Sequence, residues 1–305
     1  MARTSSDPEG VEARQAEVLP SAAGGETPPL PMTALPRVSV IIPAMNEARN
    51  LPWVFQRMPN VYEVVLVDGH STDDTVIVAR NLWPDIRVVT QTGRGKGDAL
   101  TAGFRTARGD VLVTLDADGS ADPAEIPSFV DALLSGADFA KGSRFVAGGG
   151  SADLTLLRRI GNGGLTFTVN RLFGSRYTDL CYGYNAFWAH CVPYIREGYD
   201  GFEIETVVTL NVTTAGLVVR EVASFELERM HGVSNLRTFR DGFRVLRTIV
   251  SERVRVSRGD VRRRPVLADR PLTALMEVRR ATQTGVIEDD AIGRLGTAES
   301  ESVAS

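Results

Sequence analysis

No stretch of the 305-residue sequence approaches the ~20 consecutive apolar residues that a helix needs to cross a bilayer. Residues 1–36 lack the apolar core of a signal peptide. Cysteine is scarce, and Cys181 and Cys191 form no CxxC pair, which favours a reducing compartment. A formal net charge of −4 argues against general nucleic-acid binding. We therefore expect a cytoplasmic protein whose partners do not include nucleic acid.

Composition divides the chain into parts that differ in their ability to fold. Residues 1–36 are rich in Pro, Gly, Ala, Ser and Glu without a hydrophobic period, which predicts a disordered tail. The 43% hydrophobic content of the chain suffices for one large core. We place that core in a folded domain at residues 37–235, followed by a basic helical segment at 236–285 and a flexible tail at 286–305.

Short β-branched runs alternate with helix-compatible segments in the first half of the chain. Strands are predicted at residues 38–42, 64–67 and 111–115, and helices at 48–58, 73–82, 97–107 and 123–134. This alternation predicts an α/β fold with a mostly parallel central sheet and helices on both faces. Ligands of such sheets bind at the carboxyl ends of the strands.

Polar loops follow the three strands above and a further strand that ends before residue 93; these loops lie at residues 43–47, 68–75, 93–100 and 116–120. In the last of these loops, Asp116 and Asp118 emerge together from the end of a buried strand. Two carboxylates suit Mg²⁺ or Mn²⁺, which fill their remaining coordination positions with substrate phosphates and water. The pair therefore indicates a divalent cation and a substrate with a diphosphate. An acidic loop that caps the next helix is the alternative.

Several motifs together resemble the family 2 glycosyltransferases, which have a Rossmann-like GT-A fold. Within that family the chain is similar to the polyprenyl-phosphate (dolichol-phosphate) mannosyl- and glucosyltransferase branch, over roughly residues 37–253. The motifs are VIIPAMNE at 40–47, DGHSTDDT at 68–75, GKGDAL at 95–100, LDADGS at 115–120, KGSRF at 141–145, GGG at 148–150 and GVSNLR at 232–237.

The resemblance implies a site for a nucleotide-sugar donor and a metal ion. Its donor contacts would come from Pro43, Ala44, Asn46, Glu47, Asp68, Lys96 and Asp116. The metal would be held by Asp116 and Asp118, with Ser120 where the branch often has a metal-binding Gln. The usual Asp-Asp-Gly-Ser reads DGHS at residues 68–71, so one nucleotide-contacting acid is missing and both GDP and UDP remain open. Asn46 could instead be a helix cap.

The resemblance also implies groups that bind an acceptor phosphate. A polyprenyl phosphate is already an anionic nucleophile, so it needs guanidinium groups more than a base. Arg144 and Arg158 match the branch's two phosphate-binding arginines, with Asn162 near a polar helper and Arg159 as the adjacent alternative. These arginines and Asp118 are the expected catalytic residues, together with Asp179.

A soluble hydroxyl acceptor would require a general base. Asp179 is the first candidate, because the family carries an acid at the matching place, and Glu203 and Glu205 are weaker candidates. The favoured function is metal-dependent, inverting transfer of a hexose to polyprenyl phosphate. The alternatives are transfer to a soluble hydroxyl and a catalytically silent sugar-nucleotide-binding protein.

Residues 236–256 carry arginines among Leu, Phe, Val and Ile, in the pattern of a basic amphipathic helix. Such a helix could lie on the inner face of a membrane, where a peripheral enzyme would meet a lipid phosphate. It could equally pack on the catalytic domain with its arginines in solvent.

Overall fold

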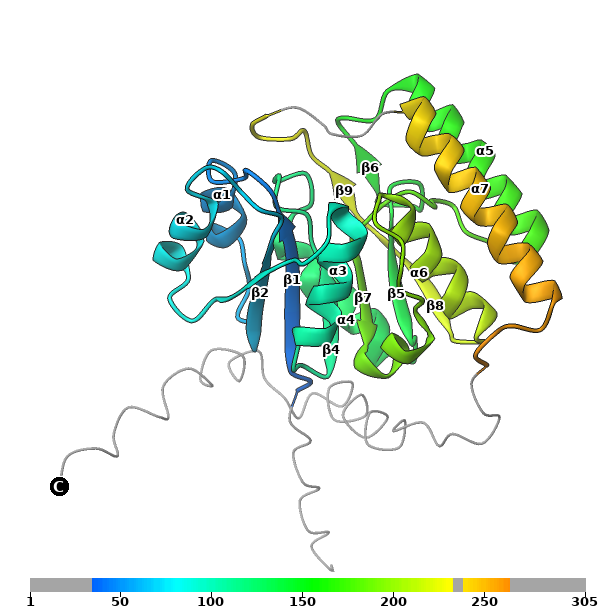
Figure 1. Ribbon diagram of the computed structural model, residues 1–305, viewed down its shortest axis with the longest axis horizontal. Coiled ribbons are helices and arrows are strands. Elements are labelled where there is room, and N and C mark those ends of the chain that lie inside the picture. Colours follow the sequence, from blue (N-terminus) through cyan, green and yellow to red (C-terminus); the bar gives the residue numbers. More distant parts are fainter. Residues whose placement is uncertain (1–34, 233–237, 264–305) are drawn as a thin grey trace, which may run out of the picture. The chain divides into compact units, whose positions relative to one another are not determined.

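The computed structural model describes residues 35–232 and 238–263 of the chain. The predicted tail at 286–305, nearly all of the tail at 1–36 and the end of the basic segment at 236–285 lie outside these residues. The motif at 232–237 is described only at Gly232. Within the described residues the protein is a seven-stranded sheet with helices on both faces (Figure 1). The predicted α/β architecture is confirmed.

The first half of the chain alternates strands with helices, as its sequence pattern predicts. Its elements are β1 (Val38–Ala44), α1 (Leu51–Gln56), β2 (Glu63–Asp68), α2 (Thr75–Leu82), β3 (Arg87–Thr90), α3 (Gly95–Thr106) and β4 (Val111–Thr114). Helix α1 begins at Leu51 rather than at the predicted residue 48, because residues 48–50 form turns. Pro52 fits the first turn of α1, where its missing N–H is not needed.

The second half is less regular. It contains η1 (Pro123–Glu125), α4 (Ile126–Leu134), β5 (Phe139–Ser143), β6 (Gly150–Ser151), α5 (Leu156–Phe173), β7 (Asn185–Trp188), η2 (Ala189–Tyr194), α6 (Glu203–Thr214), β8 (Val219–Ala223), β9 (Phe225–Glu226) and α7 (Thr238–Ser257). The helix predicted at 123–134 is thus divided into the 3₁₀ turn η1 and α4. No helix among the described residues is long and apolar enough to cross a membrane.

The strand order of the main sheet is β3-β2-β1-β4-β7-β5-β8. Strand β1 runs parallel to both β2 and β4, with Val40 opposite Val64 and Val113. Only β7 runs against its neighbours β4 and β5, so the sheet is mostly parallel. The carboxyl ends of β1, β2, β3 and β4 therefore meet at one edge, and their loops are brought together there.

Three apolar clusters hold these layers together. Alternate residues of β1, β2 and β4 point to opposite faces of the sheet, so Val40 packs toward α1, α2 and α4, whereas Ile41 packs toward α3 and α6. A third cluster joins α6 to α5 and α7 through Val169, Leu210 and Ile249. Helices α5 and α7 consequently form an additional outer layer beside α6 (Figure 1).

Candidate active site

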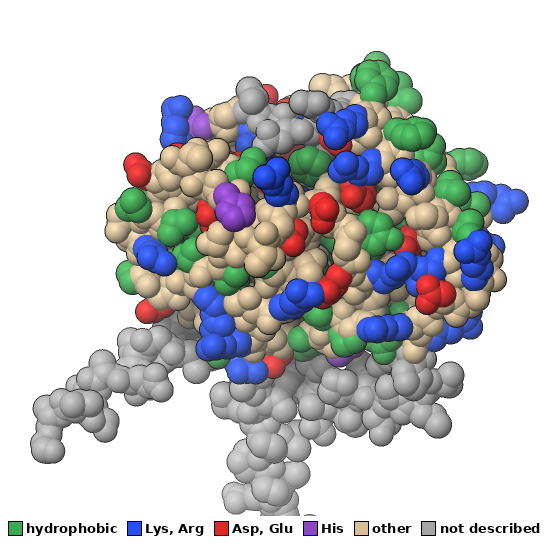
Figure 2. Space-filling view, viewed as in Figure 1, with side chains coloured by type: hydrophobic (Ala, Val, Ile, Leu, Met, Phe, Trp, Pro, Cys, Tyr) green, Lys and Arg blue, Asp and Glu red, His purple; other side chains and the backbone are tan. Residues whose placement is uncertain are grey.

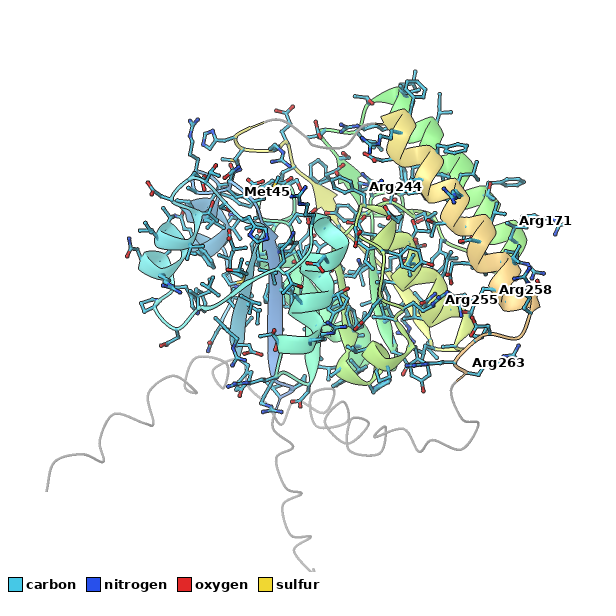
Figure 3. The ribbon with its side chains drawn as sticks, in the orientation of Figure 1. Met45, Arg171, Arg244, Arg255, Arg258 and Arg263 are labelled. Atoms are coloured by element: carbon cyan, nitrogen blue, oxygen red, sulfur yellow. The ribbon has the colours of Figure 1, made fainter. Side chains whose placement is uncertain are left out.

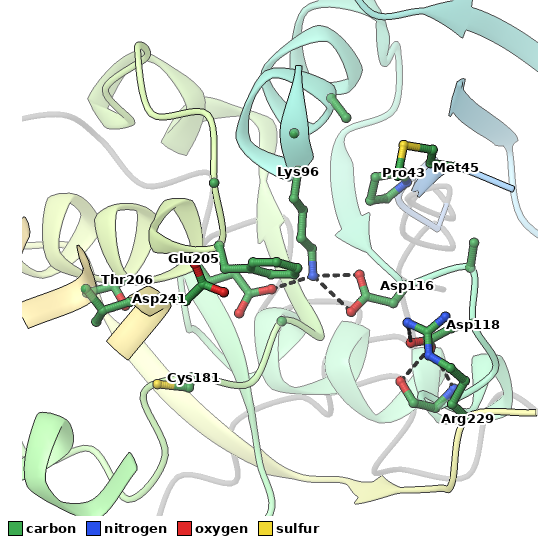
Figure 4. Close-up of a pocket in the computed structure, with 18 of the residues that line it drawn as sticks. Pro43, Met45, Lys96, Asp116, Asp118, Cys181, Glu205, Thr206, Arg229 and Asp241 are labelled. Atoms are coloured by element: carbon green, nitrogen blue, oxygen red, sulfur yellow. Dashed lines mark hydrogen bonds and ion pairs between the residues drawn. The ribbon is translucent and has the colours of Figure 1, made fainter. Parts of the chain in front are cut away.

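A cavity of about 960 Å³ opens at the carboxyl ends of the parallel strands (Figure 4). Its lining comes from distant parts of the sequence, including the loops after β1 and β4, the start of α3, and helices α5, α6 and α7. Of the predicted site residues it contains Pro43, Ala44, Glu47, Lys96, Asp116, Asp118, Ser120, Arg144, Arg158, Asn162 and Glu205. The structure thus gathers most of the predicted site around one space.

Lys96 joins two carboxylates in this cavity. Its Nζ lies 2.6 Å from Asp116 Oδ1 and 2.5 Å from Glu205 Oε1 (Figure 4). Burial alone would lower the pKa of Lys96, but the charges of Asp116 and Glu205 outweigh it and raise that pKa. Burial also raises the pKa of Glu205, against the effect of Lys96. Lys96 is therefore a fixed cation beside the aspartate pair.

Two glycines place Lys96 at the start of α3. Gly95 has a left-handed φ of +84°, and a Cβ at Gly97 would lie 1.7 Å from the carbonyl oxygen of Tyr199. The Gly97 N–H donates to the carbonyl oxygen of Asp200 at 3.0 Å. Glycine is thus required because the loop before α6 packs directly on this turn. The same contact brings Glu205 of α6 toward Lys96.

Arg229 holds the second aspartate. Its guanidinium lies 2.7 Å from Asp118 Oδ2 and 3.1 Å from Glu47 Oε1, and Asp118 Oδ1 accepts from the Ser120 hydroxyl at 2.7 Å. Burial raises the pKa of Glu47, despite a hydrogen bond from Asn50 and the charge of Arg229. Arg229 was not among the predicted site residues, because no motif in the sequence links it to Glu47 or Asp118, its partners from the loops after β1 and β4.

We call Glu47, Lys96, Asp116, Asp118, Glu205 and Arg229 the carboxylate cluster. Its four carboxylates exceed its two cations by two formal negative charges. Within the described residues no group of three or more His, Cys, Asp or Glu side chains is arranged to hold a metal ion. Two aspartates nevertheless suit Mg²⁺ or Mn²⁺ that shares its coordination with substrate phosphates. The residues present therefore fit the predicted metal.

Two of the predicted donor contacts lie elsewhere. Asn46, at a left-handed φ of +61°, accepts from the Thr72 N–H at 2.7 Å through its side-chain oxygen. The buried carboxylate of Asp68 accepts from the Ser71 N–H at 3.2 Å. Neither residue lines the cavity. Both side chains brace the loops after β1 and β2, and their contact with a nucleotide stays a prediction.

Arg144 is buried and doubly paired. It donates to Asp179 from Nε at 2.7 Å and Nη2 at 2.9 Å, and to Glu226 from Nη1 at 3.0 Å. Asp179 is fully buried and does not line the cavity. Burial alone would raise the pKa of Asp179, but its hydrogen bonds and ion pair with Arg144 give a net lowering. In this structure Asp179 orients Arg144, and its predicted role as a base remains untested.

Helix α5 contributes donors with fewer partners. Arg158 lies 3.4 Å from Asp153, whereas the neighbouring Arg159 stacks over Phe145 and does not line the cavity. Asn162, one turn after Arg158, accepts from the Cys181 N–H at 3.0 Å. Its buried Nδ2 has no hydrogen-bond partner among the described residues. We call Arg144, Arg158 and Asn162 the arginine cluster, since these residues line the same cavity as the carboxylates.

Glu203, the other weaker candidate for a base, lies outside the cavity lining. It is mostly buried, and its Oε1 accepts from the Gly201 N–H at 3.2 Å near the start of α6. Its other oxygen lies 3.6 Å from Arg244. Glu205 is thus the weaker candidate that the fold places in the cavity.

Comparison with known proteins gives several matches. The chain is 36% identical over 230 residues to the polyprenol monophosphomannose synthase of Mycolicibacterium smegmatis, which covers 68% of this chain and 84% of that protein. It is 32% identical over 216 residues to the undecaprenyl-phosphate mannosyltransferase of Micrococcus luteus, and the match covers 66% of this chain and 87% of that protein. It also matches a dolichol-phosphate mannosyltransferase of Pyrococcus furiosus with 42% identity over 122 residues, 37% of this chain, but spans only 34% of that protein's length.

The fold also matches solved structures. One is glucosyl-3-phosphoglycerate synthase from Mycobacterium tuberculosis in complex with Mn²⁺, UDP and glucosyl-3-phosphoglycerate. The TM-score is 0.56 at 22% sequence identity, with 71% of this chain and 80% of that chain covered. The family model for glycosyl transferase family 2 matches residues 39–200, in agreement with the motifs at the strand ends. The chain belongs to glycosyl transferase family 2.

Proposed function

We propose that this protein transfers a hexose from GDP- or UDP-sugar to polyprenyl phosphate, with inversion at the sugar carbon. One observation carries the proposal: a single cavity is lined by the carboxylate cluster and by the arginine cluster. The first suits a cation with a diphosphate, and the second offers hydrogen-bond donors to an anion. Relatives named for polyprenol and undecaprenyl phosphate support this acceptor class.

Asp116 and Asp118 would hold Mg²⁺ or Mn²⁺ together with the donor diphosphate, and Ser120 would orient Asp118. The ion would stabilise the negative charge of the departing nucleotide diphosphate as a Lewis acid. Lys96 holds the Asp116 carboxylate in place. Pro43 and Ala44 line the same cavity and would contact the nucleotide. The solved relative with Mn²⁺ and UDP has this fold and supports a divalent metal here.

The acceptor phosphate would lie against α5. Among the described residues, the Arg158 guanidinium pairs with Asp153 at 3.4 Å, and Asn162 Nδ2, one helical turn away, has no hydrogen-bond partner. An oxyanion there would accept hydrogen bonds from both side chains and would replace the weak contact of Arg158. Arg144 adds positive charge nearby but is already bonded to two carboxylates. A phosphate nucleophile is anionic, so the reaction needs no base.

Transfer to a soluble hydroxyl is the second candidate, and Glu205 is the observation that favours it. Glu205 lines the cavity, and burial raises the pKa of its carboxyl, against the opposing charge of Lys96. Its ion pair with Lys96 must open before it can accept a proton. A silent sugar-nucleotide-binding protein is disfavoured, because both aspartates and Arg144 are present in the cavity.

The deciding experiment presents the purified protein with Mg²⁺ or Mn²⁺, a panel of GDP- and UDP-sugars, and undecaprenyl or decaprenyl phosphate. Mass spectrometry of the lipid fraction should detect a glycosylated polyprenyl phosphate and identify the donor. Donor binding without lipid product would refute the proposal in favour of a soluble acceptor. We further propose that the enzyme works at the inner face of the membrane, where such an acceptor would be met.

A further inference from the structure

Helix α7 is apolar on two sides. Its inner side packs into the protein, where Val245 and Ile249 are buried and Glu252 accepts from Asn211 of α6 at 2.9 Å. Its outer side carries a second apolar stripe at helical spacing, which is exposed: Phe239, Phe243, Leu246, Val250 and Val254. Phe239 is 79% exposed and Phe243 69% exposed. An apolar core needs only the first side, so the second requires another explanation.

Helix α5 continues this apolar surface. It lies beside α7, and its exposed residues include Leu156, Ile160 and Phe167, which fall on one side of the helix. Asn162 and Val169 on its other side are buried. Figure 2 shows hydrophobic side chains gathered along the edge of the molecule that α5 and α7 form in Figure 1. We call these exposed sides of α5 and α7 the outer helix face.

Taken together, helices α5 and α7 are basic, opposite in sign to the formal charge of the whole chain. Helix α5 carries three arginines and no acid, and α7 carries five arginines and two acids. Of those acids, Glu252 is buried and pairs with Arg255, so these two charges offset each other and four arginines of α7 remain against Asp241. Arg171 extends outward from the end of α5 (Figure 3). The chain as a whole has a formal charge of −4, which makes this basic surface a local feature.

The outer helix face adjoins the cavity. Arg158 and Leu165 of α5 and Arg240 and Val245 of α7 line the cavity, while their neighbours on the same helices form the exposed stripes. A lipid whose phosphate lay at Arg158 would therefore have exposed apolar side chains of the same helices close to its phosphate. Exposed Phe and Leu beside arginine are the composition of helices that lie in the interface of an anionic bilayer.

We propose that the outer helix face docks on an anionic phospholipid bilayer, with the apolar stripes among the acyl chains and the arginines at the headgroups. The proposal rests on the proposed polyprenyl-phosphate acceptor and extends it from α7 alone to a surface built by both helices. It explains why α7 has two apolar sides. It also places the cavity, which the same two helices line, beside the membrane surface.

The test is sedimentation of the full chain with phosphatidylcholine vesicles that contain or lack phosphatidylglycerol. We expect binding to the anionic vesicles, weakened by salt. The double variant Phe239→Ser/Phe243→Ser should bind about tenfold or more weakly, because two exposed Phe side chains can no longer be buried in lipid. Ile77→Ser is the matched control, since Ile77 is 60% exposed but lies on α2, distant from α7 in Figure 1.

A second readout separates the surface from the reaction. Transfer to a short-chain polyprenyl phosphate in free solution should be the same in the double variant and the wild type. Equal vesicle binding by both proteins, or equal binding to neutral and anionic vesicles, would overturn the proposal. So would a dimer in solution that the double variant dissociates, without vesicle binding by the wild type. Vesicle binding that depends on Phe239 and Phe243, without transfer to any acceptor, would support the surface and refute the proposed reaction.

Discussion

The carboxylate cluster and the Arg158 and Asn162 side chains of the arginine cluster line one cavity but differ in how fully they are hydrogen-bonded. In the first, Lys96 and Arg229 lie between carboxylates, and every charge already has a partner. In the second, Arg158 has one long contact and Asn162 has an unpartnered donor among the described residues. The carboxylate cluster must exchange partners when a cation enters, whereas Arg158 and Asn162 keep hydrogen-bond donors that are weakly held or unpartnered among the described residues. The difference suits a cation with a diphosphate in one place and a lone phosphate in the other.

We expect the largest effect from a substitution of Asp118 in the carboxylate cluster. Asp118→Asn removes a charge that would hold the metal, and we expect transfer to fall about 100-fold or more, the cost typical of losing a group that stabilises developing charge. Initial rates with Mn²⁺ and polyprenyl phosphate measure this. Asp131→Asn, on the exposed surface of α4, is the control and should retain wild-type rates. Undiminished metal-stimulated transfer by the Asp118→Asn variant would remove Asp118 from the site.

Arg144 should matter for folding as well as for acceptor binding. Arg144→Ala leaves the fully buried Asp179 without its bidentate partner, and such a loss costs about 3–5 kcal/mol of unfolding free energy. Urea denaturation measures the difference. Arg158→Ala should cost much less in the same assay, because Arg158 is partly exposed and loosely held. Equal stability of the two variants would contradict the structural role of the Arg144–Asp179 pair.

Arg158 should contribute to binding of the acceptor lipid and not to binding of the nucleotide sugar. Removing a charged hydrogen-bond donor to a phosphate costs roughly 1.5–3 kcal/mol, so Arg158→Ala should raise KM for polyprenyl phosphate by about 10- to 100-fold. KM for the nucleotide sugar should stay near the wild-type value. Arg159→Ala is the matched control, because Arg159 is adjacent, exposed and outside the cavity lining. An unchanged KM for the lipid in the Arg158→Ala variant would reject its assignment.

Asp116 and Asp118 of the carboxylate cluster could be predicted from local sequence signals, whereas the members of the arginine cluster were selected by the motif resemblance. Asp116 and Asp118 directly follow a β-branched run, and parallel strands bring such loops to one edge. Arg229 was missed, because it is far in sequence from Glu47 and Asp118 and contacts them only in the folded structure. The orientation of Asn46 was also hidden, because it depends on a left-handed backbone conformation.

The sequence of helix α5 shows why the structure around the arginine cluster was harder to predict. Gly161, Gly163 and Gly164 lie in its middle, and glycine disfavours a helix interior. Packing of Val169 against α6 and α7 outweighs that preference, and it depends on residues far away in the chain. The motif resemblance selected Arg158 and Asn162 without indicating that Asn162 has an unpartnered donor. It also could not show that Asp179 lies behind Arg144 rather than in the cavity.

Low pH should remove the contribution of the Arg144–Asp179 ion pair to the unfolding free energy. The pKa of Asp179 is lowered in the folded protein, so its ion pair stabilises the fold above the unfolded pKa of about 4 and is lost as the pH falls through the lower folded pKa. The difference in unfolding free energy between the wild type and Asp179→Asn should therefore be constant near neutrality and shrink below about pH 4. If this difference in unfolding free energy stayed unchanged in strong acid, Arg144 and Asp179 would not interact as an ion pair.

The smallest expected effect tests whether Arg229 competes with the metal for Asp118. The Arg229 guanidinium lies 2.7 Å from Asp118 Oδ2. A cation that binds this oxygen must therefore displace the guanidinium or share the oxygen with it. Arg229→Ala should raise the affinity of the substrate-free protein for Mn²⁺ a few-fold, because a partly exposed ion pair contributes about 1 kcal/mol. Titration followed by electron paramagnetic resonance measures free Mn²⁺ directly. Arg57→Ala is the control, since Arg57 pairs with Asp122 just beyond the motif. A lower Mn²⁺ affinity in the Arg229→Ala variant would mean that Arg229 orients Asp118 for the metal instead of competing with it.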